Sequence, residues 1–95
     1  MIIQTIKIKS NLSEELLLDI ARERSAQFRE IPGLVQKYYT KLDEPGAYAG
    51  VYVRDSPEAL QNFRVSDLAN SIAQAYQSIC PPEVKISNLL FQLRD

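Results

Sequence analysis

Two Pro-Gly pairs, Pro32-Gly33 and Pro45-Gly46, constrain the fold of this chain more than any other sequence feature. The segment between them, residues 34–42 (LVQKYYTKL), is rich in β-forming residues and has no helical stripe. Residues 47–54 (AYAGVYVR) have the same character. Because proline and glycine interrupt regular structure, we predict a β-hairpin of these two segments that turns at the second Pro-Gly pair.

The residues before the hairpin predict a strand and then a helix. Residues 1–9 (MIIQTIKIK) place apolar residues with period two, which is the pattern of a strand. From Ser13 the apolar residues recur at three- and four-residue steps, and Ser13 or Asn11 can cap the helix that this pattern predicts. Acids lead and arginines follow along it, as the helix dipole favours. The helix should end at the first Pro-Gly pair.

The residues after the hairpin predict a second helical segment and a last strand. Ser56 can cap this helix, and Pro57 suits its first turn, where no amide hydrogen is needed. Residues 65–67 (VSD) can restart the helix, so we expect a break there. Pro81-Pro82 ends the segment, and residues 84–93 (VKISNLLFQL) predict the fourth strand.

The order βαββαβ predicts one ferredoxin-like α+β domain over residues 1–95. Right-handed crossovers place both helices on one face of a four-stranded antiparallel sheet with strand order 4-1-3-2. Nothing in the chain covers the other face. The fourth strand offers apolar residues to both faces, with Leu89, Phe91 and Leu93 on one of them, so a polar outer face is not expected. We therefore expect a homodimer that buries this face and forms a dimeric α/β barrel.

Composition argues against several classes of function. A net charge of -1 gives no reason to expect a nucleic-acid partner. No apolar run approaches the ~18 residues of a membrane span, and the alternating N-terminus is unlike a signal peptide, so we expect a cytoplasmic protein without a membrane partner. Cys80 is the only cysteine and histidine is absent, which removes Cys/His zinc sites and Ser-His or Cys-His nucleophile pairs. The carboxylates are isolated on turns and caps, so no metal is expected.

Three segments resemble a known superfamily. They are FREIPGLVQKYY (28–39), AYAGVYVRDSPEAL (47–60) and FRVSDLA (63–69), and they resemble the dimeric α/β-barrel superfamily. More closely, the chain is similar to the small monooxygenases of the antibiotic biosynthesis monooxygenase (ABM) type. The resemblance covers nearly the whole chain, and its motifs specify fold more than chemistry.

The resemblance implies two sheets packed back to back and a ligand pocket in each subunit between sheet and helices. Some members oxidise polycyclic phenols without metal or flavin, and others degrade haem. This chain has no Trp and no His, which argues against haem chemistry. The expected function is therefore cofactor-independent monooxygenation of a small aromatic or apolar molecule. The alternative is a non-catalytic ligand-binding or structural dimer.

Basic side chains on the predicted strands are candidates for binding an anion. These strands carry lysines and Arg54 but no acid, which would favour a phenolate and stabilise an oxyanion. Arg24 lies on the apolar stripe of the first helix, where a charge should be paired or bind a ligand; it could instead snorkel or pair across the dimer. Lys37, Lys41 and Lys85 lie on the edge strands and could instead protect those edges from pairing.

Aromatic side chains complete the candidate site. Tyr38 and Tyr39 are neighbours in a strand and point to opposite faces, so only one of them can face the helices, and the sequence does not say which. A tyrosine with an ordinary pKa near 10 can orient a ligand as a hydrogen-bond donor but needs a nearby cation to act as a base. The alternative for these tyrosines, and for Phe28 and Phe63, is ordinary packing in the core. The candidate ligand-binding residues, none with an assigned catalytic role, are Arg24, Phe28, Tyr38, Tyr39, Tyr52, Arg54 and Phe63.

Overall fold

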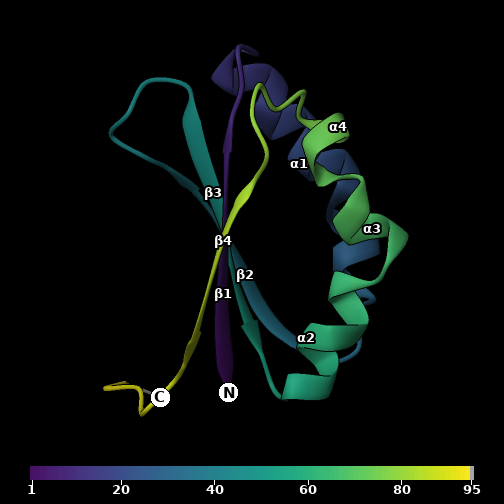
Figure 1. Cartoon of the computed structure of the whole chain (residues 1–95), viewed down its shortest axis with the longest axis vertical. Coiled ribbons are helices and arrows are strands. Elements are labelled where there is room, and N and C mark those ends of the chain that lie inside the picture. The colour runs from purple at the N-terminus through teal and green to yellow at the C-terminus, as the bar shows by residue number, and fades with distance from the viewer. Residues whose placement is uncertain (95) are drawn as a thin grey trace.

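The computed structural model describes residues 1–94 and has the predicted order of elements (Figure 1). The strands form one antiparallel sheet in the order β2-β3-β1-β4, which confirms the predicted topology. The elements are β1 (Ile2–Lys9), α1 (Glu14–Arg29), β2 (Leu34–Lys41), β3 (Ala47–Arg54), α2 (Pro57–Arg64), α3 (Asp67–Asn70), α4 (Ile72–Ala75) and β4 (Glu83–Asn88).

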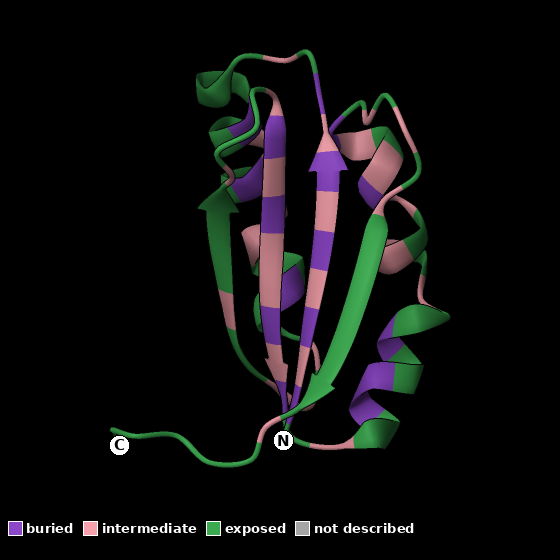
Figure 2. Ribbon diagram, turned by 60° about the vertical axis from the view of Figure 1, so that its left-hand side comes forward, coloured by how far each residue is buried: buried purple, intermediate pink, exposed green. Residues whose placement is uncertain are grey.

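All four helices lie on one face of the sheet (Figure 1). Along β1, the residues that face the helices are buried and their neighbours are half-buried. In β3, Ala47 and Ala49 on the outer face are buried as well, so both central strands are banded in Figure 2. The buried core between the two layers contains residues of β1, β3 and the helices. Its members are Ile6, Ile8, Leu17, Ala21, Phe28, Tyr52, Phe63, Ile72 and Tyr76.

Serine caps set the starts of three helices. The hydroxyl of Ser13 accepts from the amide of Leu16 and begins α1, and that of Ser56 begins α2 in the same way. The expected break in the second helical segment is present, because Ser66 caps a new helix, α3, directly after Val65 ends α2. Each cap satisfies an amide that the first turn of a helix otherwise leaves without a partner.

Gly33 joins α1 to β2 at a position that only glycine fits. Its φ is +81°, in the left-handed region, and a Cβ there would lie 2.5 Å from the Cβ of Ala59. The carbonyl of Gly33 also accepts from the amide of Asp55 at 2.9 Å, which ties this corner to the end of β3. The first Pro-Gly pair therefore fixes the start of the hairpin against α2.

The fourth strand is shorter than predicted, and the expectation of a strand over residues 84–93 was wrong at both ends. β4 begins at Glu83, so the strands do carry an acid, and it ends at Asn88. The reason is register: Asn88 pairs with Ile2, the first residue of β1, so the following residues have no β1 residue to pair with. Leu90, Phe91 and Leu93 are 92%, 78% and 88% exposed beyond the strand end (Figure 2).

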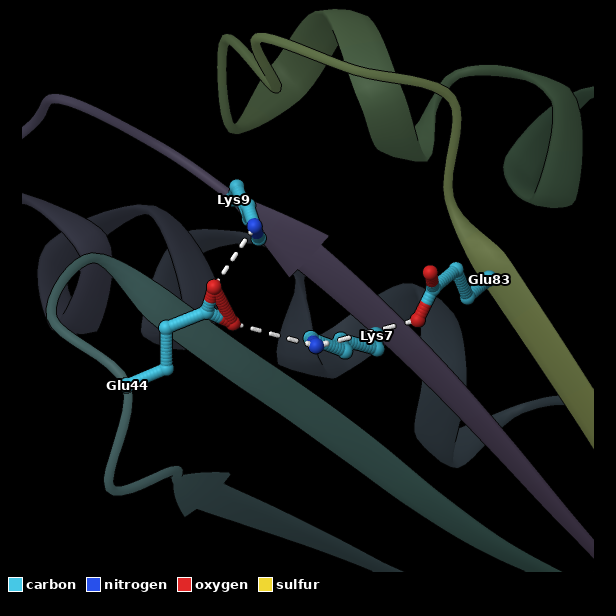
Figure 3. A network of polar contacts seen from close by, with 4 residues as sticks. All are labelled: Lys7, Lys9, Glu44 and Glu83. Atoms are coloured by element: carbon cyan, nitrogen blue, oxygen red, sulfur yellow. Dashed lines mark ion pairs between the residues drawn. The ribbon is translucent and has the colours of Figure 1, made fainter.

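The outer face of the sheet is apolar in its centre and charged at one end. Register places Val51 on this face beside Tyr38, and Val53 beside Ile3. The β4 residues on the same face are polar. The prediction that the fourth strand is apolar on both faces was therefore wrong. The apolar part of the outer face belongs to β1, β2 and β3. At the charged end, Lys7 and Lys9 of β1 form ion pairs with two glutamates, Glu44 and Glu83 (Figure 3).

Candidate functional site

The register of β2 decides which tyrosine of the hairpin faces the helices. Lys37 lies opposite Tyr52, which is buried in the core, and Tyr39 lies opposite Gly50. Because side chains alternate along a strand, Lys37 and Tyr39 face the helices and Tyr38 faces away from them. Tyr38 is 55% exposed on the outer face and therefore has no place in a cavity on the helix side.

Two cavities lie on the helix side and share the ring of Tyr39. The first, of about 280 Å³, has a mainly apolar lining between α1 and the sheet that includes Leu17, Ala21, Tyr48 and Tyr76. The second, of about 320 Å³, lies between α1 and β2. Its lining consists of Ser25, Phe28, Arg29, Leu34, Val35, Gln36, Lys37 and Tyr39. Of the candidate residues, Phe28 and Tyr39 line these cavities.

Lys37 is the residue of this site that sequence reasoning missed. Its Nζ atom lies 3.4 Å from the ring centroid of Phe28, 4.4 Å from that of Tyr39 and 4.7 Å from that of Tyr52. Within residues 1–94, no carboxylate oxygen lies within 4.0 Å of this amine. Burial, together with the positive charges of Arg24 and Arg54, lowers the pKa of Lys37 to about 7.

The expected role of Lys37 as an edge-protecting lysine does not match this position. The amine is folded over the ring of Phe28 on α1 instead of projecting from the edge of the sheet. One sequence signal pointed to this position: Lys37 and Tyr39 are two residues apart on one strand and therefore share a face. That signal could not identify the helix-side face, because a bulge near Val35 shifts the register at the start of β2.

Arg54 is fully buried, without an acidic partner in the described chain. Its Nε and Nη2 atoms donate to Oε1 of Gln4 at 3.3 and 3.0 Å, and its Nη1 atom has no hydrogen-bond partner among residues 1–94. The guanidinium lies 4.1 Å from the ring centroid of Phe63 and 5.0 Å from that of Tyr52. Burial lowers its pKa. Arg54 thus belongs to the core behind the cavities and does not line either of them.

Arg24 connects α1 to the second helical segment. Its Nη2 atom donates to the carbonyl of Leu68 and to the hydroxyl of Ser71, both at 3.2 Å. The guanidinium also lies 5.8 Å from the ring centroid of Phe28 and 5.9 Å from that of Tyr76. The predicted need for a partner on this apolar stripe is therefore met only at Nη2, by a carbonyl and a hydroxyl, while the Nε atom is buried without a hydrogen-bond partner among residues 1–94.

The remaining aromatic candidates form a packed cluster beneath the cavities. The ring centroids of Phe28, Tyr52 and Phe63 are separated by 5.5–6.1 Å, and all three side chains are buried. Burial raises the pKa of Tyr52 and that of Tyr39, so both hydroxyls are neutral at physiological pH. These tyrosines can therefore donate a hydrogen bond but do not supply a negative charge.

Three cations lie over the aromatic rings, and none of them has a carboxylate within 4.0 Å in residues 1–94; the first cavity does have a carboxylate in its lining, Glu14, which pairs with Lys41. Arg24, Lys37 and Arg54 all lie over the cluster of Phe28 and its neighbours. An anion bound beside them would be stabilised by their charges, and more strongly because the surroundings are partly dehydrated. Within residues 1–94, no group of His, Cys, Asp and Glu is arranged to hold a metal ion. None of the described helices is both long enough and apolar enough to span a membrane.

Comparison with known proteins relates this chain to others through structure. No family model and no curated protein sequence matches it. Among solved structures, NE2512, a protein of unknown function from Nitrosomonas europaea, matches with a TM-score of 0.79 at 14% identity over 99% of this chain and 93% of that one.

Two further structures come from Streptomyces. SnoaB from Streptomyces nogalater, a cofactor-independent oxygenase, has a TM-score of 0.76 at 13% identity over 99% of this chain and 97% of its own. The monooxygenase ActVA-Orf6 from Streptomyces coelicolor, in complex with Nanaomycin D, has a TM-score of 0.76 at 15% identity over 99% of this chain and 91% of its own. This chain therefore has the ferredoxin-like fold of the antibiotic biosynthesis monooxygenases.

Proposed function

We propose that this protein binds a small phenolic aromatic molecule between α1 and the sheet and oxidises it with molecular oxygen without a cofactor. The observation that carries the proposal is the set of three cations over aromatic rings that has no carboxylate partner in residues 1–94. The apolar first cavity suits the body of an aromatic ligand, and Lys37, which lines the second cavity on the other side of Tyr39, suits its phenolate oxygen.

The proposed reaction needs only the ligand and oxygen. Loss of the phenolic proton gives an electron-rich phenolate, which reduces molecular oxygen. One oxygen atom enters the ring to give a quinone, and the other leaves as water with the two displaced hydrogens. The protein contributes binding, orientation and stabilisation of negative charge. The likeness in fold to the cofactor-independent oxygenase SnoaB supports this proposal.

The proposal is tested by oxygen uptake with a panel of polycyclic phenols, together with binding of the same phenols without oxygen. Leu18 is exposed at the lining of the first cavity, so Leu18→Trp should fill the cavity and abolish binding and uptake. Leu16→Trp is the matched control, because Leu16 is exposed on the same helix outside both cavities. Oxygen uptake that survives Leu18→Trp would contradict the proposed site. Binding without uptake would assign the alternative, non-catalytic function.

We further propose that a second copy of this chain covers the outer face of the sheet. The centre of that face is apolar, and the segment after β4 is apolar and exposed, so a dimer would bury both. Sedimentation of the unaltered protein should show a dimer. Val51→Lys, at the centre of the face, should give a folded monomer, whereas Val65→Lys, in the exposed link between α2 and α3, should not. A monomeric unaltered protein would contradict this proposal.

A further inference from the structure

We propose that Lys37 is the base that takes the proton from a phenolic ligand bound on the helix side of the sheet. This inference rests on the proposed function and assigns its first chemical step. Lys37 lines the second cavity and is half-buried, so its amine is open to a ligand. Tyr39, the next residue on the same face of β2, lines both cavities.

The surroundings of the Lys37 amine leave it without a counter-ion. Its Nζ atom contacts the face of the Phe28 ring at 3.4 Å and lies within 5 Å of the Tyr39 and Tyr52 ring centroids. No carboxylate of residues 1–94 lies within 4.0 Å. A lysine that is paired with a carboxylate stays protonated and cannot accept a proton. Lys37 has no carboxylate of residues 1–94 within 4.0 Å, and this makes its amine suitable as a base.

The charged groups on every neighbouring element favour the neutral amine. Helix α1 contributes Arg24 and Arg29, and β3 contributes Arg54 and the neutral phenol of Tyr52. Burial, Arg24 and Arg54 together lower the pKa of Lys37 to about 7, and burial is the largest of these causes. Much of the amine is therefore unprotonated at physiological pH, and a base is most effective when its pKa lies near the working pH.

The proposed step is a simple proton transfer. The phenolic O–H bond breaks, its electron pair stays on the ligand oxygen, and the proton forms a new bond to Nζ of Lys37. The same arginine charges that disfavour protonation of the amine favour the phenolate, so they lower the pKa of the ligand as well. The product is a phenolate beside the ammonium ion of Lys37, with the charges of Arg24 and Arg54 behind that amine and outside the cavity lining. That phenolate is the species that reduces oxygen in the proposed function.

A suitable probe is 2-naphthol, because its neutral and ionised forms have different absorption spectra. The measurement is made without oxygen at a mildly alkaline pH, where Lys37 is mostly neutral and free 2-naphthol is un-ionised. The unaltered protein should bind the naphtholate without releasing a proton to the buffer, because Lys37 receives it. Calorimetry in two buffers of different ionisation enthalpy measures that proton release.

Three variants separate a base from a simple cation. Lys37→Met should bind neutral 2-naphthol or none. Lys37→Arg should bind naphtholate but release a proton to the buffer, because arginine is already protonated. Lys85→Met, at an exposed position of β4, should behave as the unaltered protein. Neutral naphthol bound to the unaltered protein, proton release on its binding, or no binding at all would each overturn the assignment.

Oxygen-uptake measurements distinguish a failure of this inference from a failure of the proposed function. If Lys37 is the base, Lys37→Met, which cannot hold the phenolate, lowers the rate by about 100-fold and abolishes the rise in rate as pH passes the pKa of Lys37. Naphtholate binding that depends on Lys37, with no oxygen uptake on any phenol, would reject the oxygenase and keep the base. Full oxygen uptake by Lys37→Met would reject the base and keep the oxygenase.

Discussion

Lys37 on the helix face of the sheet and the lysines Lys7 and Lys9 on its outer face have opposite environments. On the outer face, Lys9 lies 2.6 Å from Glu44, and Lys7 lies 3.2 Å from Glu44 and 3.7 Å from Glu83 (Figure 3). On the helix face, Lys37 lies over aromatic rings. The hydrogen bond that Lys9 donates to Glu44 raises the pKa of Lys9, whereas burial is the main cause that lowers that of Lys37 to about 7. The sheet therefore carries ordinary solvated ion pairs on one face and an unpaired, titratable amine on the other.

The difference shows that the number of cations on a strand does not predict a ligand-binding site, because the environment of each cation decides what it can bind. Exposed ion pairs such as those of Lys7 and Lys9 are screened by water and contribute little to stability or binding. A cation that is enclosed by aromatic rings without a carboxylate is held at a cost in free energy. A phenolate ligand would relieve that cost. We therefore propose that a ligand binds on the helix face, and the following predictions test this proposal in order of expected effect.

The largest effect is expected from the only hydrogen-bond partner that the described chain gives to the Arg54 side chain. Gln4→Leu removes the acceptor of both Arg54 hydrogen bonds and leaves a fully buried guanidinium without any. The free energy of unfolding should fall by about 3 kcal/mol in urea denaturation. Gln27→Leu, on the exposed side of α1, is the control and should change it by less than about 0.5 kcal/mol. If Gln4→Leu and Gln27→Leu changed the free energy of unfolding equally, the hydrogen bonds from Arg54 to Gln4 would not stabilise the fold.

The second effect is a pH dependence caused by Lys37. Its pKa is near 7 in the folded protein and 10.5 in the unfolded chain, so the unfolded chain binds more protons between these values. Stability should therefore rise from pH 7 toward alkaline pH, by about 1 kcal/mol per pH unit from this residue. Urea denaturation of the unaltered protein and of Lys37→Met across this range measures the contribution. The same slope in both proteins would contradict the lowered pKa.

The third prediction concerns the cation behind Lys37. Arg54→Met removes a buried charge but leaves the buried Gln4 side chain without its hydrogen-bond partner, so stability should fall by about 1 kcal/mol. The pKa of Lys37 should rise, because one positive neighbour is lost, but stay below 10.5, because burial is the main cause of the shift. An NMR titration of the lysine side chains measures it. An unchanged or lower pKa would show that Arg54 does not act on Lys37.

The smallest effect is expected on the outer face. Glu44→Gln removes the carboxylate that holds Lys9, so the pKa of Lys9 should return toward 10.5 with little change in stability. The pKa of Glu44 is lowered in the folded protein, so whatever stability the pair adds is lost as pH falls through that pKa. Thermal melts in low and high salt check this. A large loss of stability would mean that both faces carry structurally important charges.

The sequence predicted the fold better than the site. Alternation in residues 1–9, the serine caps and the Pro-Gly pairs are local signals, and they gave the correct order of elements and the correct sheet topology. The end of β4 could not be predicted, because it depends on where β1 runs out as a partner. The extension to Leu93 was read from composition alone.

The position of Lys37 depends on tertiary structure in the same way. The bulge near Val35 sets which β2 residues face the helices, and α1 brings the ring of Phe28 beneath the amine. Neither can be read from spacing along the chain. Arg54 was expected beside a pocket at the end of a strand, but Phe63 of α2 covers it. Local pattern therefore identified the residue types of the site, and packing decided which of them reach the cavity.

An NMR titration of the lysine side chains in the ligand-free protein tests this contrast between the two faces most directly. Lys37→Arg assigns the Lys37 signal by its loss, and Lys9→Arg assigns that of Lys9. We predict that Lys37 titrates near pH 7 and that Lys9 titrates above 10.5. Titration of Lys37 together with the exposed lysines would contradict the account, because the helix face would then hold an ordinary ammonium ion.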